Sequence, residues 1–157
     1  MSQPVKAIPD GYHTITPMLT VRHAAQAIEF YTKAFNAQPL YRMDGPDGKV
    51  MHAELKIGNS IVMLGEENPS MSCLAPASLK GTPISLYLYV ANVDAAFAQA
   101  VKAGAKVEMP VADTFWGDRA GQLSDPFGHR WWLATHTQDL TPEQIKQGAQ
   151  QALAEKA

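Results

Sequence analysis

Two groups of side chains in the sequence have the chemical types and the spacing that a binding or reaction site requires. In the first group, His52 and Glu54 are two residues apart in a segment with the alternating pattern of a β-strand, so their side chains share one face. An imidazole beside a carboxylate can act as an acid–base pair, and we take these two residues as the candidate catalytic pair. They could also form half of a metal site, or be polar strand residues that pair with Arg42 or Lys56 across the sheet.

The second group is the run Phe115-Trp116-Gly117-Asp118-Arg119. Its aromatic side chains could form a lid over a binding site. The guanidinium of Arg119 suits a carboxylate or phosphate group, which it binds through two parallel hydrogen bonds. The alternative is a structural turn in which Asp118 and Arg119 pair with each other and Trp116 covers the edge of the core. Both interpretations stay open.

The elements that must position these residues repeat in the same order in the two halves of the chain. In the first half we predict a strand at 12–21, a helix at 24–35, and strands at 38–43, 50–57 and 60–64. In the second half we predict a strand at 85–90, a helix from Val93 capped by Asn92, and strands at 106–111, around 122–124 and at 129–135. The fold class is therefore α+β, with two βαβββ modules.

The modules span residues 12–66 and 84–136, and the Asn-, Ser- and Pro-containing segment 67–83 is expected to link them. After the second module, Thr141-Pro-Glu-Gln144 has the spelling of a capping box with proline at the first helical position. It predicts a C-terminal helix over 141–156.

Composition excludes several classes of function. The chain has 157 residues and a net charge of -2, which gives no reason to expect binding to nucleic acid or to an anionic membrane. No apolar run is long enough to cross a bilayer, and the first ten residues lack the layout of a secretory signal. Cys73 is the only cysteine, so an intrachain disulfide is impossible. We expect a cytoplasmic protein.

Three stretches resemble a known family: ITPMLTV…AIEFYTKAF, MHAELKIGNSIVML and FWGDRAGQLSDPFGHRWWLATH. They are similar to the vicinal-oxygen-chelate (glyoxalase and bleomycin-resistance) superfamily, and the last two resemble its PhnB-like branch. The resemblance implies a U-shaped mixed sheet around a cavity, and usually a homodimer. Activities in this superfamily range over lyase, isomerase, epoxide opening, extradiol cleavage and ligand sequestration, so the fold alone does not fix the function.

The resemblance also implies where a metal would bind. Metal-dependent members supply four ligands, from the first and last strands of each module. Aligned by motif, the first-strand positions are Thr16 and Ser85, and the last-strand positions are Met63 and Trp132. None of these is a normal ligand for Zn²⁺, Ni²⁺, Fe²⁺ or Mn²⁺. We therefore expect that the familial metal site is lost and that the protein has no cofactor.

These observations predict a homodimer that binds a small amphipathic molecule in the cavity, where a mostly apolar wall carries a few polar groups. The expected ligand-binding residues are Thr16, Met63, Ser85, Tyr87, Tyr89, Trp116, Arg119 and Trp132. The alternative is a metal-dependent lyase, isomerase or dioxygenase-like enzyme with a displaced site at His52 and Glu54. A third possibility is a scaffold protein whose interior is filled by side chains.

Overall fold

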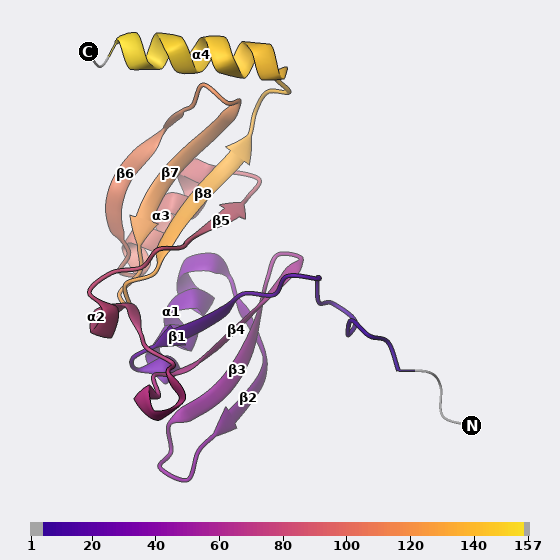
Figure 1. Cartoon of the computed structure of the whole chain (residues 1–157), viewed down its shortest axis with the longest axis vertical. Coiled ribbons are helices and arrows are strands. Elements are labelled where there is room, and N and C mark those ends of the chain that lie inside the picture. Colours follow the sequence, from indigo (N-terminus) through magenta and orange to yellow (C-terminus); the bar gives the residue numbers. More distant parts are fainter. Residues whose placement is uncertain (1–4, 156–157) are drawn as a thin grey trace. The chain divides into compact units, whose positions relative to one another are not determined.

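The chain folds into two compact units, each built on one four-stranded mixed sheet (Figure 1). The structure, a computed structural model, describes residues 5–155, and the division falls between Gly81 and Thr82. In each unit a strand is followed by a helix and then by three more strands. This order confirms the predicted α+β class with βαβββ modules.

In the first unit, the sheet has the strand order β1-β4-β3-β2, with β1 parallel to β4 and the other neighbours antiparallel. Its elements are β1 (Met18–Val21), α1 (Ala24–Phe35), β2 (Gln38–Asp44), β3 (Val50–Ile57), β4 (Ser60–Glu66), η1 (Pro69–Met71) and α2 (Pro76–Leu79). The expected start of the first strand at Tyr12 is wrong, because β1 begins at Met18. The Pro17 carbonyl still accepts a hydrogen bond from the Met63 amide, but proline has no N–H group of its own to donate.

The second unit repeats this topology, with strand order β5-β8-β7-β6 and β5 parallel to β8. Its elements are β5 (Ser85–Tyr89), α3 (Val93–Ala103), β6 (Lys106–Asp113), β7 (Asp118–Ser124), β8 (Arg130–His136) and α4 (Pro142–Ala154). The predicted caps are present, since Asn92 accepts from the Ala95 amide and Thr141 forms a capping box with Gln144. The predicted end of the last helix at 156 lies outside the described residues.

The expected linker, 67–83, is organised by one carboxylate of the first unit. Glu67 accepts hydrogen bonds from the Ser78 hydroxyl, from the Ala75 amide at 2.7 Å and from Arg22 Nε at 3.0 Å. These bonds, led by the one from Ser78, lower the pKa of Glu67 to about 2. The segment therefore holds two short helices rather than an irregular connection.

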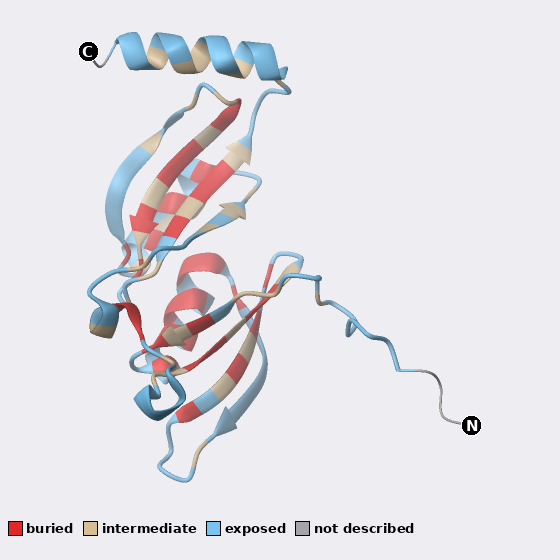
Figure 2. Ribbon diagram, viewed as in Figure 1, coloured by how far each residue is buried: buried red, intermediate tan, exposed pale blue. Residues whose placement is uncertain are grey.

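One face of each sheet is covered by the helix of its own unit. In the first unit, Tyr31 and Phe35 of α1 stack on each other with ring centroids 6.0 Å apart, and both are buried. In the second unit, α3 packs so closely on the sheet that a Cβ at position 121 would lie 2.7 Å from the Phe97 ring, so only glycine fits there. Most buried strand residues therefore lie in the inner strands β3, β4, β7 and β8, whereas β2 and β6 are almost entirely exposed (Figure 2). The opposite face of each sheet is left open within its unit.

The edge strands β2 and β6 are exposed along almost their whole length. Both contain a proline and a break in register, at Pro39 in β2 and next to Pro110 in β6. A proline removes a donor from the edge, and a bulge twists it away from any neighbouring chain. These features oppose further strand pairing at the β2 and β6 edges, whereas β1 and β5 form the opposite edges of the two sheets.

The helices α1 and α3 each begin against the last strand of their own sheet. In the first unit, the Glu66 carboxylate of β4 accepts from the backbone amides of His23 and Ala24, each at 2.8 Å. In the second unit, Thr135 of β8 accepts in the same way from the Val93 amide at 2.9 Å. A carboxylate is the stronger partner at a helix N-terminus because it also interacts favourably with the helix dipole.

We predict that Glu66→Ala lowers the free energy of unfolding by about 1–2 kcal/mol, the usual cost of removing an N-terminal cap. Urea denaturation followed by circular dichroism measures this loss. Glu29→Ala, an exposed glutamate inside α1, is the matched control and should change stability by less than about 0.5 kcal/mol. Equal stability of the two variants would show that Glu66 does not cap the helix.

Candidate functional site

A row of four side chains crosses the open face of each sheet, set by the pairing of its strands. In the first unit the row is Met18, Met63, Glu54 and Tyr41. In the second unit it is Tyr87, Trp132, Gln122 and Met109. The two rows occupy equivalent positions. At the first three positions the first row carries two thioethers and a carboxylate where the second carries two aromatic rings and an amide, and at the fourth Tyr41 corresponds to Met109.

The rows show which first-strand residues face the last strands. Met18 lies opposite Met63 and Tyr87 lies opposite Trp132, so Thr16 and Ser85 each lie two residues before the residue that faces the last strand. Thr16 precedes β1 and its hydroxyl donates to the His13 carbonyl. Ser85 pairs with Arg130 at the start of β8. Neither the β1–β4 pairing nor the β5–β8 pairing brings imidazoles or carboxylates together. The side chains at the four familial positions therefore do not fit a divalent metal ion.

The second unit is organised around the carboxylate of Asp118, which is only 2% exposed. Its Oδ2 atom accepts from the Tyr87 and Tyr89 hydroxyls, both at 3.0 Å, and from Trp116 Nε1 at 3.2 Å. Its Oδ1 atom lies 2.8 Å from His136 Nδ1. Four donors thus surround one buried charge, and they fix the positions of the aromatic rings that carry them.

Ionisation of this cluster follows from its hydrogen bonds. Burial acts to raise the pKa of Asp118, but its hydrogen bonds, led by the one from His136, outweigh burial and lower the pKa. Burial and the bonds to Asp118 raise the pKa of both Tyr87 and Tyr89. Because both hydroxyl protons are committed to the carboxylate, the tyrosine oxygens can offer only lone pairs to a ligand.

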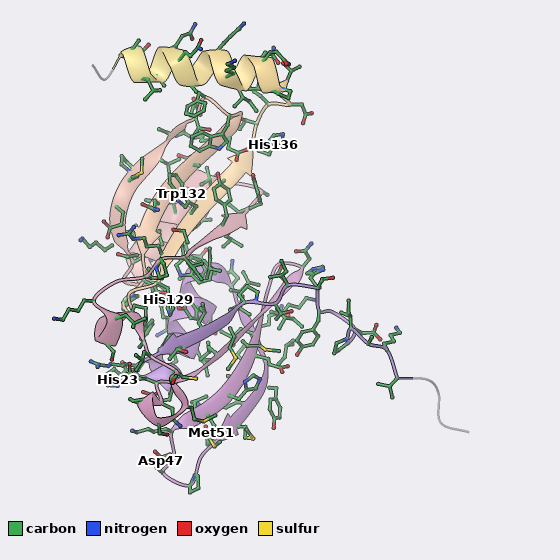
Figure 3. The ribbon with its side chains drawn as sticks, in the orientation of Figure 1. His23, Asp47, Met51, His129, Trp132 and His136 are labelled. Atoms are coloured by element: carbon green, nitrogen blue, oxygen red, sulfur yellow. The ribbon has the colours of Figure 1, made fainter. Side chains whose placement is uncertain are left out.

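We call Tyr87, Tyr89, Trp116 and Trp132 the aromatic platform. Tyr87 stacks on Trp132 with centroids 6.1 Å apart and an interplanar angle of 15°, while Trp116 meets Trp132 edge-on at 6.4 Å. Tyr87 is 42% exposed and Tyr89 is 60% exposed, so part of this surface is accessible within the unit. Trp132 and His136 both lie along β8 (Figure 3). The platform can stack a flat ring system.

Arg119 takes no part in this cluster. Its guanidinium binds both carboxylate oxygens of Asp94 at 2.8 Å and one of Asp113 at 3.1 Å. The alternative in which Asp118 and Arg119 pair with each other is therefore wrong. The two residues are neighbours at the start of β7, where successive side chains point to opposite faces of the sheet. A role for Arg119 in binding a ligand stays a prediction.

In the first unit, the structure brings His52 and Glu54 together and adds a third group. His52 Nε2 lies 3.2 Å from Glu54 Oε1, and the Tyr12 hydroxyl donates to Glu54 Oε2. These bonds, led by the one from Tyr12, lower the pKa of Glu54, and the bond to Glu54 raises the pKa of Tyr12. The expected alternative partners are wrong, since Arg42 pairs with Asp44 and Lys56 has no bond to either residue.

A groove of about 410 Å³ opens beside this row within the first unit. Its walls include three thioether side chains and several polar groups, among them Met18, Met51, Met71, Asp47 and Lys49. Met51 and Asp47 lie at the hairpin end of β3 (Figure 3). Methionine side chains are flexible and polarisable, so such a wall can adapt to different apolar surfaces.

Among residues 5–155, no three side chains of His, Cys, Asp or Glu are grouped so that they could hold a metal ion. Over the same range, none of the helices has the length and apolar character needed to span a membrane.

The fold and the paired modules define the class of protein, and comparison with known proteins supports it. The chain belongs to the Glyoxalase/Bleomycin resistance protein/Dioxygenase superfamily, whose family model matches residues 12–133. It is 44% identical over 135 residues to an uncharacterized protein of Mycobacterium bovis, covering 84% of this chain and 89% of that one. Protein YjdN of Escherichia coli is 24% identical over 139 residues, covering 76% and 92%.

Solved structures show the same fold. TioX from a Micromonospora species aligns with a TM-score of 0.64 at 27% identity, covering 78% of this chain and 97% of TioX. The PhnB protein from Bacillus cereus aligns with a TM-score of 0.60 at 21% identity, covering 78% and 99%. The predicted superfamily is thus confirmed, and the PhnB protein is among its structural neighbours.

We predict that the pKa of His136 lies above the ordinary value of 6.5, because Asp139 and then Asp118 bind the imidazolium. The resulting contribution to stability is present in full below that ordinary pKa, and it is lost as pH rises through the raised value. Proton NMR titration of the wild-type chain and of Asp139→Asn measures the shift, which should shrink in the variant. The control variant Glu108→Gln, at the other end of the same sheet, should leave the titration of His136 unchanged. A His136 pKa at its ordinary value in the wild-type chain would contradict the prediction.

Proposed function

We propose that the protein is a binding member of its superfamily that holds a small, flat, amphipathic molecule on the aromatic platform without the family metal. The observation that carries this proposal is the Asp118 cluster, in which one buried carboxylate holds two phenols and an indole in fixed positions. Stacking surface with a few placed polar atoms is the usual composition of a small-molecule site.

The electrostatics of the platform favour a ligand that carries hydrogen-bond donors or positive charge. The Tyr87 and Tyr89 oxygens accept but do not donate, and the ring faces of tyrosine and tryptophan attract cations. Asp118 and Asp139 together outweigh the single charge of a protonated His136. An anionic ligand would meet negative charge and no free donor from the two hydroxyls.

The proposed absence of a metal rests on the residues at the familial positions. Thr16, Ser85, Met63 and Trp132 offer no imidazole or carboxylate, and neither do Met18 and Tyr87, which lie opposite Met63 and Trp132. A homodimer remains part of the proposal, because the superfamily resemblance implies it. Large side chains are exposed on the open face of each sheet, among them Met18 and Tyr87. Exposed apolar surface of this kind is typical of protein–protein interfaces.

We predict that elemental analysis by inductively coupled plasma mass spectrometry finds far less than one divalent ion per chain. The protein should be untagged and purified without chelator. Incubation with Zn²⁺, Ni²⁺, Mn²⁺ or Fe²⁺ followed by desalting should not change this result. A stoichiometric ion would overturn the metal-free proposal and favour the alternative enzyme, with His52 and Glu54 as the first residues to replace.

We predict that a planar cationic probe, 9-aminoacridine, binds more tightly than the equally flat anionic probe anthracene-9-carboxylate. Quenching of tryptophan fluorescence gives both dissociation constants. Trp132→Leu should weaken binding of the cationic probe about three- to tenfold, which corresponds to the ordinary value of an aromatic stack. Phe127→Leu removes an aromatic ring from the turn before β8 and is the matched control. Equal affinity for the two probes, or an unchanged affinity in Trp132→Leu, would overturn the proposed site.

A further inference from the structure

The trio Tyr12, Glu54 and His52 in the first unit plays no part in the proposed binding function. Its geometry is that of a base held by a carboxylate. The His52 and Glu54 side chains are 23% and 21% exposed, so they are partly withdrawn from water but still reachable. Both lie in β3, on the open face of the sheet, and the same strand contributes Met51 to the groove described above.

The hydrogen bonds decide which nitrogen of His52 carries the proton. Glu54 is held as a carboxylate by the Tyr12 hydroxyl and by His52, which together lower its pKa. A carboxylate can only accept, so His52 Nε2, at 3.2 Å from Oε1, must be the donor. In the neutral ring the lone pair then lies on Nδ1. That atom has no hydrogen-bond partner within residues 5–155.

Apart from Glu54, the side chains beside His52 are largely apolar. Met43 lies opposite His52 in the strand pairing, Met63 lies opposite Glu54, and the Tyr41 ring is 6.3 Å from the imidazole. Met43 is 41% exposed and Tyr41 is 51% exposed, so the wall is open to a small molecule. Such a wall favours a substrate that is itself small and largely apolar, because burial of apolar surface would hold it there.

We propose that His52 is a metal-independent general base for a small, apolar carbon acid, with Glu54 and Tyr12 as positioning residues. Nδ1 removes a proton from carbon, and the freed electron pair moves into an adjacent bond of the substrate and displaces a leaving group. The proton stays on the imidazolium, which the Glu54 carboxylate stabilises, until water removes it. This site uses residues of the first unit only and does not depend on ligand binding at the aromatic platform.

The test uses nitrobenzisoxazole, a flat carbon acid that needs only a base. Removal of the ring C–H proton forms the nitrile and breaks the N–O bond, and the electron pair ends on a coloured phenolate. We expect the full chain to react faster than free imidazole at the same concentration. His52→Ala should lose about 100-fold in rate, the lower end of what a positioned base contributes. His13→Ala, which removes an exposed imidazole from the same unit, should keep the wild-type rate.

The role of Glu54 has a readout that does not depend on activity. Long-range proton–nitrogen NMR of the wild-type chain should show the His52 proton on Nε2, and Glu54→Gln should shift the ring toward the other tautomer and lower the rate. Tyr12→Phe should lower the rate less, because it removes only the outer hydrogen bond. A wild-type rate no greater than that of imidazole, full activity of His52→Ala, or a proton on Nδ1 in the wild-type chain would each overturn the proposal. The NMR result stands even if a variant fails to fold.

Discussion

The parallel pairing of the first and last strands within each module sets the register on which both candidate sites depend. Because β1 lies on β4 with Met18 opposite Met63, the next strand places Glu54 in the same row. In a sheet the side chains alternate between faces, so a slip of one residue would bury Glu54 under α1 and expose the core. The apolar face that packs on the helix therefore fixes the polar residues of the open face.

The two modules share one backbone design but carry different chemistry. Glu54 of the first row corresponds to Gln122 of the second, and only the glutamate can act as a charged acceptor. The charge of the second unit comes instead from Asp118, which enters from the start of β7 and is buried by its four donors. One module thus presents a carboxylate that orients a histidine, and the other presents a carboxylate that orients aromatic rings.

Much of this arrangement could be predicted from residue patterns. Strand alternation and helix spacing indicate the βαβββ order, and i, i+2 spacing indicates that His52 and Glu54 share a face. The start of β1 and the role of Asp118 could not be predicted, because they depend on pairing between distant segments. Tyr12 reaches Glu54 across 42 positions of sequence, and no local pattern encodes such a contact. The alternation of Asp118, Ala120 and Gln122 was the available signal that Asp118 shares the open face.

A buried carboxylate that accepts from four donors resists both protonation and replacement by a ligand. Breaking any one of these bonds would leave a polar group unpaired beside a charge, at a cost of about 1–3 kcal/mol. The proposed ligand would therefore stack on the platform from outside the Asp118 cluster rather than enter it. The first unit differs, because its carboxylate leaves one nitrogen of the histidine available. His52 Nε2 is bonded to Glu54, whereas Nδ1 has no hydrogen-bond partner within residues 5–155. The same principle, a carboxylate satisfied by fixed donors, thus underlies both proposals: a closed support for stacking in one module and an open, directed base in the other.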